Sequence, residues 1–404
     1  MAVTHDPSAY ARTFDSAVPR FVSEAARRAP GLSARLRAAG VTVEALTNVA
    51  ALDRLPVLTK DEVIELQAKD PPFGGLVAAD ARPLRVFQSP GPIYEVQLEG
   101  LDQWRWAPAL EAAGFTAHDV VLNAFAYHLT PAGAMFEEAC RKLGATVFPA
   151  GVGNLDAQVR ACADLAVTAY VGTPSYLKAL LEAAELRGGR AVASLRRAFV
   201  TAEPLPESLR GWLLERLEVV LQGYGTAETG NLGFECSRMQ GWHVPDDALV
   251  QVCDVDTGVA IDDERQGQVV ATVFTPAAPV LRFGTGDLSA WHQGPCSCGL
   301  GTPRLRGWLG RVGDGVKVRG MFLHPRQVAE VMAQVDGVSR YRFTVERTDH
   351  RDVLRCTVVA PGRDSDVAGE VRSKIRASLR FDVDVQLVGS LSDAPIIEDL
   401  RTWS

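Results

Sequence analysis

The segment at residues 222–230 limits most strongly what this chain can fold into. It follows an apolar run at residues 219–221 that is typical of a buried strand. Its glycines let a ligand approach the backbone closely. It presents one aromatic ring, two hydroxyls and one carboxylate together: Tyr224, Thr226, Thr229 and Glu228. A ring can cover a base, a hydroxyl can bind a phosphate oxygen, and a carboxylate can bind Mg²⁺. A glycine turn with an incidental glutamate is the alternative interpretation.

Strand-like and helix-like patterns alternate through the middle of the chain. Apolar strand-like runs fall at residues 119–125, 145–148, 169–174 and 197–201, and helical patterns fall at residues 101–113, 134–143 and 175–187. This spacing predicts βαβ units around a mainly parallel sheet. Two or three helices are expected before residue 50. Another helix should begin after Thr59, because Thr59 and Glu62 have the spacing of a capping box.

A smaller unit is predicted at the C-terminal end. Helices at residues 324–335 and 364–379 alternate with strands at residues 341–346, 353–360 and 383–388. The predicted fold class is therefore α/β. A large N-terminal domain at residues 1–310, with mainly parallel sheets, helices and a small β-rich part, precedes a small α+β domain at residues 311–404.

Composition excludes several other classes of protein. The chain has 404 residues, of which 47% are hydrophobic and 23% charged, as in an ordinary globular protein. Its net charge of −7 and the lack of a basic tract argue against nucleic-acid binding. We expect neither a secretory signal nor a membrane span, and seven cysteines do not make a disulfide scaffold. A reduced, cytoplasmic location is expected.

Two further motifs follow the first one. They are Arg282-Phe-Gly-Thr-Gly-Asp287 and Gly310-Arg311-Val-Gly-Asp314-Gly-Val-Lys317-Val-Arg-Gly320. In this order and spacing the three segments resemble those of the adenylate-forming enzymes, which have Tyr-Gly-x-Thr-Glu, Arg-x-x-Thr-Gly-Asp and Gly-Arg-x-Asp-x-x-x-Lys-x-x-Gly. Within that superfamily the chain is most similar to the phenylacetate-CoA ligase branch, on the basis of Ala202-Glu203-Pro204-Leu205-Pro206, the Cys-x-Cys-Gly near position 296 and the compact length.

The resemblance implies an AMP-forming acyl- or aryl-CoA ligase that uses Mg-ATP, CoA and a carboxylic acid, which could be aromatic. It assigns Mg²⁺ to Glu228, the α-phosphate to Thr226, the ribose to Asp287 and Arg311, and the adenine face to Tyr224. Further positions that it implies are nucleotide contacts at Ser89, Ala202, Glu203, Pro204 and Gly225, an acyl pocket at Tyr127 and His128, and a hinge at Gly313 that lets the small domain act as a lid. The alternative for residues 313–315 is a hairpin turn. A homodimer is an open alternative to a monomer.

Both phosphate-handling elements of that superfamily are altered in this chain. The family's phosphate loop reads Ser-Ser-Gly-Thr-Thr-Gly-Lys, whereas residues 89–95 read Ser-Pro-Gly-Pro-Ile-Tyr-Glu. Two prolines remove two N–H donors, so these residues favour a rigid turn between strands over an intact phosphate cradle. The catalytic lysine expected in Gly-Ser-Leu-Pro-x-x-x-x-Gly-Lys is absent from residues 389–399. Two alternatives remain open: a protein that binds an adenylate, a CoA thioester or another nucleotide conjugate without forming the adenylate, and a partner subunit with a vestigial site.

Three cysteines and one histidine have the spacing of a metal site. Cys236 and His243 form a Cys-x6-His pair, and Cys296-Ser-Cys298 follows about 60 residues later. Together they could close a tetrahedral Cys₃His zinc site, although reduced cysteines are also often simply buried. The resemblance places Cys, His, Cys and Cys at matching positions and implies a structural zinc ion. His292 and Cys253 are the alternative ligands.

Overall fold

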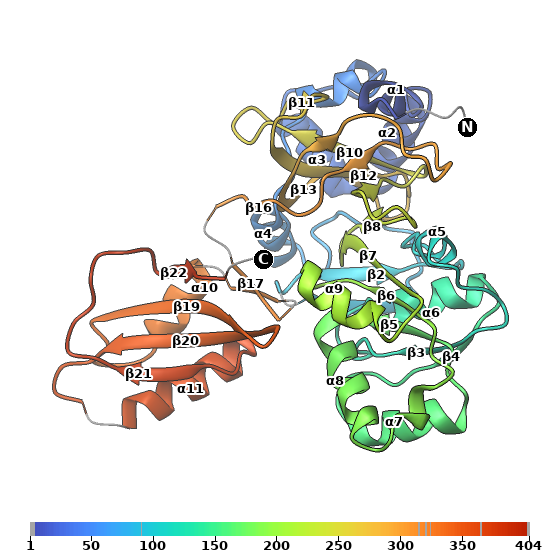
Figure 1. The fold of residues 1–404 in the computed structure, drawn as a ribbon. Helices are drawn as coiled ribbons and strands as arrows, with labels where there is room; N and C mark the ends of the chain where they lie inside the picture. The colour runs from blue at the N-terminus through green and yellow to red at the C-terminus, as the bar shows by residue number, and fades with distance from the viewer. Residues whose placement is uncertain are drawn as a thin grey trace. The chain divides into compact units, whose positions relative to one another are not determined.

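The computed structural model describes residues 5–89, 91–313, 316–319, 321–323, 325–363 and 366–401. The chain divides into two compact units, one of Met1–Leu205 with Arg210–Gly310 and one of Pro206–Leu209 with Arg311–Ser404. Each unit has its own sheets, helices and hydrophobic core (Figure 1). Among the described residues, no helix is long and apolar enough to cross a membrane.

The large unit is built around a nine-stranded sheet in the order β14-β15-β9-β8-β7-β6-β5-β3-β4. The strands β3 (Val120–Asn123), β4 (Thr146–Phe148), β5 (Ala169–Gly172), β6 (Arg197–Val200) and β7 (Val219–Thr226) pair in parallel. Their crossovers contain α6 (Ala132–Lys142), α7 (Leu155–Asp164), η3 (Arg190–Val192), α8 (Pro174–Glu185) and α9 (Glu207–Leu214). Antiparallel pairs add β8 (Gly230–Phe234), β9 (Trp242–His243), β15 (Arg304–Leu305) and β14 (Trp291–His292). The predicted α/β class with a mainly parallel βαβ part is confirmed.

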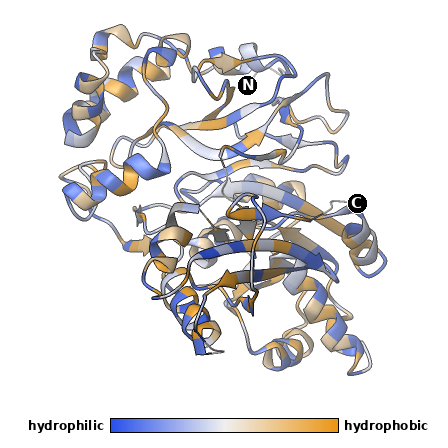
Figure 2. Ribbon diagram, turned by 90° about the vertical axis from the view of Figure 1, so that its left-hand side faces the viewer, coloured by the Kyte–Doolittle hydropathy of each residue, from blue (hydrophilic) through white to orange (hydrophobic). Residues whose placement is uncertain are grey.

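A second sheet supplies the β-rich part of the large unit. Its order is β11-β10-β12-β13-β16, with β10 at Ala248–Cys253, β11 at Ala260–Ile261, β12 at Gly267–Val273, β13 at Val280–Ser289 and β16 at Gly310–Arg311. The N-terminal helices α1 (Pro7–Arg12), α2 (Ala17–Arg28) and α3 (Pro30–Ala38) share one hydrophobic cluster with it. The buried residues of α2 are Val18, Phe21, Val22 and Ala25, which lie on one face of the helix. Hydrophobic and hydrophilic residues alternate along the helices in the same way (Figure 2).

The helix α4 (Lys60–Lys69), which follows the short helices η1 (Val43–Ala45) and η2 (Ala50–Arg54), begins at the predicted capping box. The backbone N–H of Thr59 donates to the Glu62 carboxylate at 2.7 Å, and the N–H of Glu62 donates to the Thr59 hydroxyl at 3.2 Å. Leu58 and Val63 then pack in one small cluster with Ile93 and Phe283. This cluster holds α4 beside the hairpin of β1 (Arg85–Gln88) and β2 (Tyr94–Gln97), and beside β13.

The helix predicted over residues 101–113 is shorter than expected. It begins only at Ala107 and ends at Ala112, as α5. Asp102 and Arg105 have φ of 60° and 62°, in the left-handed region that interrupts a helix. The Asp102 carboxylate accepts hydrogen bonds from the N–H groups of Trp106 at 2.7 Å and Ala107 at 3.0 Å. The aspartate therefore caps the helix at this point, which the apolar periodicity of the segment did not indicate.

The small unit has the predicted helices and strands in the predicted order, and three additional strands. A hairpin of β17 (Val316–Val318) and β18 (Met321–Leu323) precedes α10 (Pro325–Met332), β19 (Arg340–Thr348), β20 (Arg351–Val359), α11 (Asp366–Leu379) and β21 (Asp384–Leu387). The hairpin strands were not predicted, and neither was β22 (Ile397–Asp399), which pairs in parallel with β19. Two residues after β22 in the chain, the buried Arg401 forms ion pairs with Asp399 at 2.6 Å and Asp352 at 3.0 Å. The end of the chain that should carry the lysine is thus a paired strand.

Candidate functional site

The first sequence motif covers the end of β7 and the turn into β8, and there is no room for a side chain at Gly225. A Cβ atom on Gly225 would overlap the carbonyl oxygen of Gly230 and lie 2.8 Å from the indole of Trp106. At the tip, the hydroxyls of Thr226 and Thr229 lie 3.0 Å apart. The motif therefore holds its hydroxyls in a turn whose glycine is required by packing.

A Gly225→Ala variant is expected to lose about 1–3 kcal/mol of stability, because the added methyl group overlaps backbone that cannot move away. Urea denaturation measures this loss. The matched control is Gly211→Ala in α9, where a Cβ would meet no heavy atom of the described chain within 4 Å, leaving its own helix aside. That control should retain or slightly raise stability. Equal stability of the two variants would contradict the tight turn.

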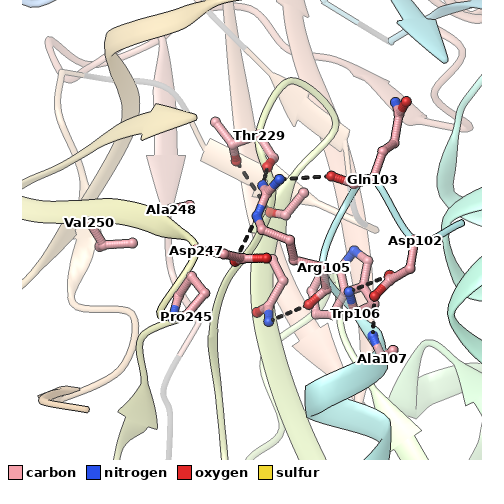
Figure 3. A network of polar contacts seen from close by, with 12 residues as sticks. Asp102, Gln103, Arg105, Trp106, Ala107, Thr229, Pro245, Asp247, Ala248 and Val250 are labelled. Carbon is pink, nitrogen blue, oxygen red and sulfur yellow. Dashed lines mark hydrogen bonds and ion pairs between the residues drawn. The ribbon is translucent and has the colours of Figure 1, made fainter. Parts of the chain in front are cut away.

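Arg105 fixes the same turn from outside (Figure 3). Its guanidinium donates to the carbonyl of Gln103 at 2.7 Å and to the carbonyl of Thr229, while Nε lies 3.6 Å from a carboxylate oxygen of Asp247. The side-chain amide of Asn231 donates back to the Arg105 carbonyl at 2.9 Å. Burial lowers the pKa of Arg105, and Asp247 opposes this shift. Sequence reasoning missed Arg105, because no motif marks it.

Tyr224 and Asp287 come together in the interior of the large unit. The Tyr224 hydroxyl donates to an Asp287 carboxylate oxygen at 3.0 Å, and Nε1 of Trp308 donates to the other oxygen at 3.1 Å. The ring of Tyr224 is stacked on Trp242, with centroids 5.1 Å apart and planes 11° apart. One face of the ring is therefore covered by protein. Asp287 lies within β13, whose pairing with β12 is irregular, rather than just after a turn.

Glu228 has a partner that the sequence did not reveal. Nζ of Lys60, at the first position of α4, lies 2.8 Å from its carboxylate, and the Glu228 side chain is only 8% exposed. Burial alone would raise the pKa of Glu228, but the charge and hydrogen bond of Lys60 and the hydroxyl of Thr226 together hold it below the ordinary value. The carboxylate is thus ionised and available to a cation.

A Lys60→Met variant is expected to lose about 3 kcal/mol of stability at neutral pH, because it leaves a buried carboxylate without its cation. The pKa of Glu228 is lowered in the folded state, so this contribution is present above the unfolded pKa and is lost as pH falls through the folded pKa. The gap between wild type and variant should therefore narrow in acid. Denaturation curves at several pH values test this, and Lys69→Met, in an exposed pair with Glu65, should change little. A gap that stays constant with pH would refute the assignment.

The segment that replaces the phosphate loop forms the turn of the β1–β2 hairpin. The N–H and the hydroxyl of Ser89 both lie within reach of the carbonyl of Ile93, at 2.9 and 3.5 Å. These contacts close the hairpin turn. Counted from Ser89, Glu95 stands at the position where the family's loop has lysine.

The other expected nucleotide and acyl positions lie at strand ends of the parallel sheet. Ala202 has φ of 71°, a strained conformation for a residue with a side chain. The Glu203 carboxylate accepts from the N–H of Ser175 at 3.3 Å, so it faces the beginning of α8. The Tyr127 hydroxyl accepts from the amide of Asn123 at 2.8 Å, and burial raises the pKa of this tyrosine. His128 is exposed, and Pro204 is half-buried.

The motif at the end of the large unit is described only in part. Arg311 ends β16 and is half-buried, and Gly313 has φ of 77°, which favours glycine. The proposed turn at residues 314–315 lies outside the described residues. In the small unit, counting the family's motif from Gly389 puts Glu398 at the place of the lysine, and Glu398 lies 4.0 Å from Arg342.

The predicted metal ligands form one cluster, in which the ligand atoms of Cys236, His243, Cys296 and Cys298 all lie within 4.8 Å of one another. Sγ of Cys236 lies 3.7 Å from Sγ of Cys296, and Sγ of Cys298 lies 3.4 Å from Nε2 of His243. Sulfur atoms at the corners of a zinc tetrahedron with bonds of about 2.3 Å are separated by about 3.8 Å.

The histidine of the cluster is prepared for metal binding. Nδ1 of His243 lies 3.1 Å from the carbonyl of Thr302, so it carries the proton and leaves Nε2 as a ligand. Burial lowers the pKa of His243 to about 4, which keeps the ring neutral. The four residues therefore fit a tetrahedral metal ion. Neither alternative ligand belongs to the group of described metal-binding residues: Cys253 is buried in β10, and His292 contacts Arg304.

Comparisons with known proteins point to one family of enzymes. Residues 101–272 match the family of AMP-binding enzymes. The chain is 30% identical over 343 residues to a phenylacetate-coenzyme A ligase of Thermus thermophilus, covering 81% of this chain and 76% of the relative. It is 26% identical over 376 residues to the phenylacetate-coenzyme A ligase of Escherichia coli, covering 89% and 84%.

A solved structure extends the likeness to both units. A 2-hydroxyisobutyryl-CoA ligase in complex with 2-HIB-AMP and CoA has a TM-score of 0.89 at 21% identity, over 98% of this chain and 90% of that one. Fold and motifs define the class of AMP-binding, adenylate-forming enzymes. Within that class, the chain belongs to the phenylacetate-coenzyme A ligase family.

Proposed function

We propose that this protein is an AMP-forming acyl-CoA ligase of the phenylacetate-CoA ligase type. It would convert a carboxylic acid, ATP and CoA into acyl-CoA, AMP and pyrophosphate by way of an acyl-adenylate. The observation that carries this proposal is the arrangement at the end of β7. There the ionised Glu228 and the hydroxyl of Thr226 lie on the same turn, and Tyr224 on the same strand holds Asp287. Relatives named as phenylacetate-coenzyme A ligases support it.

The chain's own residues take the following parts. Asp287 accepts hydrogen bonds from the ribose hydroxyls, with its orientation held by Tyr224 and Trp308. Thr226 donates to the α-phosphate, and Glu228 holds the Mg²⁺ that neutralises the phosphates. Backbone atoms of residues 202–204 lie along the adenine, and Arg311 and Ser89 make further nucleotide contacts. Tyr127 and His128 border the acid, and Gly313 is the hinge at which the domain of residues 311–404 rotates as a lid before CoA attacks.

The cysteine–histidine cluster would hold zinc in a structural role. Four protein ligands leave no open coordination position for a reacting group. The metal would instead cross-link the β8–β9 connection to the segment before β15.

A second candidate function is favoured by one specific observation. Glu95 and Glu398 stand at the two positions where the family has lysines that handle phosphate and stabilise the transition state. A protein of this kind would bind an acyl-adenylate or a CoA thioester without making the adenylate.

The experiment that separates the two functions is product analysis by mass spectrometry. The protein is incubated with Mg-ATP, CoA and a panel of aryl and alkyl acids. The ligase predicts acyl-CoA and AMP in equal amounts with at least one acid. Tight binding of AMP or of a non-hydrolysable acyl-adenylate analogue, without product from any acid, would support the second function instead.

A further inference from the structure

The large unit contains a cavity of about 330 Å³ between α4, the β1–β2 hairpin and the β12–β13 connection. Its walls are mostly apolar and include Leu58, Phe73, Leu76, Ile93, Val280 and Phe283. Tyr127, His128 and Asp287 are not among its lining residues, so it is separate from the positions assigned above to the acid and the ribose. Its size and its apolar lining suit a small organic molecule.

Two carboxylates line this cavity together, Glu95 and Glu228. Glu228 is paired with Lys60 through one oxygen, and its other oxygen is buried without a hydrogen-bond partner among the described residues. Both carboxylate oxygens of Glu95 are buried, and neither makes a hydrogen bond of ordinary geometry in the described chain, although the nearby Ser89 hydroxyl lowers the pKa of Glu95. Three unsatisfied carboxylate oxygens in one mainly apolar cavity are a strong sign of a missing partner, because such groups are costly to bury.

The charge balance indicates what that partner is. Glu95 and Glu228 carry two negative charges when both are ionised, and Lys60 supplies one positive charge. Arg105 also lines the cavity, but its guanidinium is occupied by two carbonyls and Asp247. Burial, followed by the charge of Glu228, raises the pKa of Glu95 well above its ordinary value, and Lys60 only partly opposes this. This shift favours the neutral acid, so keeping both carboxylates ionised requires one further positive charge beside them.

We propose that this cavity binds a small organic amine, whose ammonium group pairs with Glu95 and Glu228 and whose apolar body lies against the apolar walls. A single ammonium balances the charge, and a compact apolar body matches the volume and the lining. A hydrated divalent ion fits the apolar lining poorly, because it prefers a shell of oxygen ligands. Glu95 stands where the family's phosphate loop has a lysine. The ammonium group of the ligand would therefore lie near the position that the ammonium group of that lysine would occupy. The proposal does not require ligase activity, but the ammonium and the Mg²⁺ assigned above would compete for the carboxylate of Glu228.

Titration calorimetry of the full chain at pH 7.5 tests the proposal, with 2-phenylethylammonium, butylammonium and cyclohexylammonium as probes. The neutral isostere 2-phenylethanol and Mg²⁺ are the comparison ligands. At least one amine should bind, and the alcohol should bind at least tenfold more weakly than 2-phenylethylammonium. Glu95→Gln should weaken amine binding at least tenfold. Glu99→Gln, at an exposed carboxylate lining the same cavity, should leave it unchanged.

Three results would overturn the amine site. They are equal binding of the amine and the alcohol, unchanged amine binding in Glu95→Gln, and the absence of binding by all three amines at millimolar concentration. Binding of Mg²⁺ alone that is lost in Glu95→Gln would also overturn it and would make the pair a metal site. Circular dichroism of Glu95→Gln checks folding, which the isosteric and neutral glutamine should preserve.

Discussion

A Cys296→Ser and Cys298→Ser double variant is expected to lose bound zinc and to lose at least about 5 kcal/mol of folding free energy. Structural zinc sites contribute their binding energy to folding, and serine hydroxyls do not replace thiolates. The four ligand atoms lie within 4.8 Å of one another, so no large rearrangement is needed to bind the ion. Metal analysis should give about one zinc per wild-type chain and almost none in the variant, and thermal denaturation should show the lower stability.

The control for this experiment is Cys253→Ala, which removes a buried thiol outside the cluster. It should keep its zinc and lose only the small amount expected for a core truncation. Wild-type protein that is free of metal and as stable as the zinc-loaded form would contradict the metal site. Chelation of the wild-type protein offers a second route to the same answer, because it changes no residue.

An Asp287→Asn variant is expected to lower kcat/KM for ATP by at least about 100-fold, with acid and CoA saturating. A carboxylate accepts hydrogen bonds from both ribose hydroxyls, and charged hydrogen bonds contribute about 1.5–3 kcal/mol each. Asparagine has the same shape, so the packing around Tyr224 and Trp308 is largely kept. Steady-state kinetics measure the loss, and circular dichroism shows whether the variant is folded.

Asp263→Asn is the matched control, since this aspartate is exposed and pairs only locally with Arg265. It should leave the kinetics unchanged. An Asp287→Asn variant with wild-type affinity for ATP would place the ribose elsewhere and remove the nucleotide role of this carboxylate.

The features that sequence predicted well are those determined by short-range chemistry. The capping box at Thr59 and Glu62 is closed by residues three apart, and it is present as expected. The alternation of apolar strands and amphipathic helices predicted the parallel sheet, since each period records which face is buried. The cysteine–histidine spacing allowed a metal cluster and the family resemblance favoured it, and the four side chains do come together.

The features that sequence missed depend on contacts between distant segments. The ion pair of Lys60 with Glu228 joins residues far apart in the chain, and only the packing of α4 against the hairpin and β13 brings them together. The late start of α5 depends on left-handed backbone at Asp102 and Arg105, and Arg105 is held by Thr229 and Asp247. The strand β22 depends on β19 as a neighbour. The hydrophobic periodicity of a single segment does not indicate any of these contacts.

The measurement that tests the central proposal most directly is pyrophosphate release from Mg-ATP against a panel of aryl and alkyl acids, with and without CoA. The ligase predicts release that depends on the acid and continues with turnover when CoA is present. It also predicts that the altered loop and the strand at Glu398 still permit adenylation. No release with any acid, from protein that binds AMP or an acyl-adenylate analogue, would contradict the ligase and leave the binding function in its place.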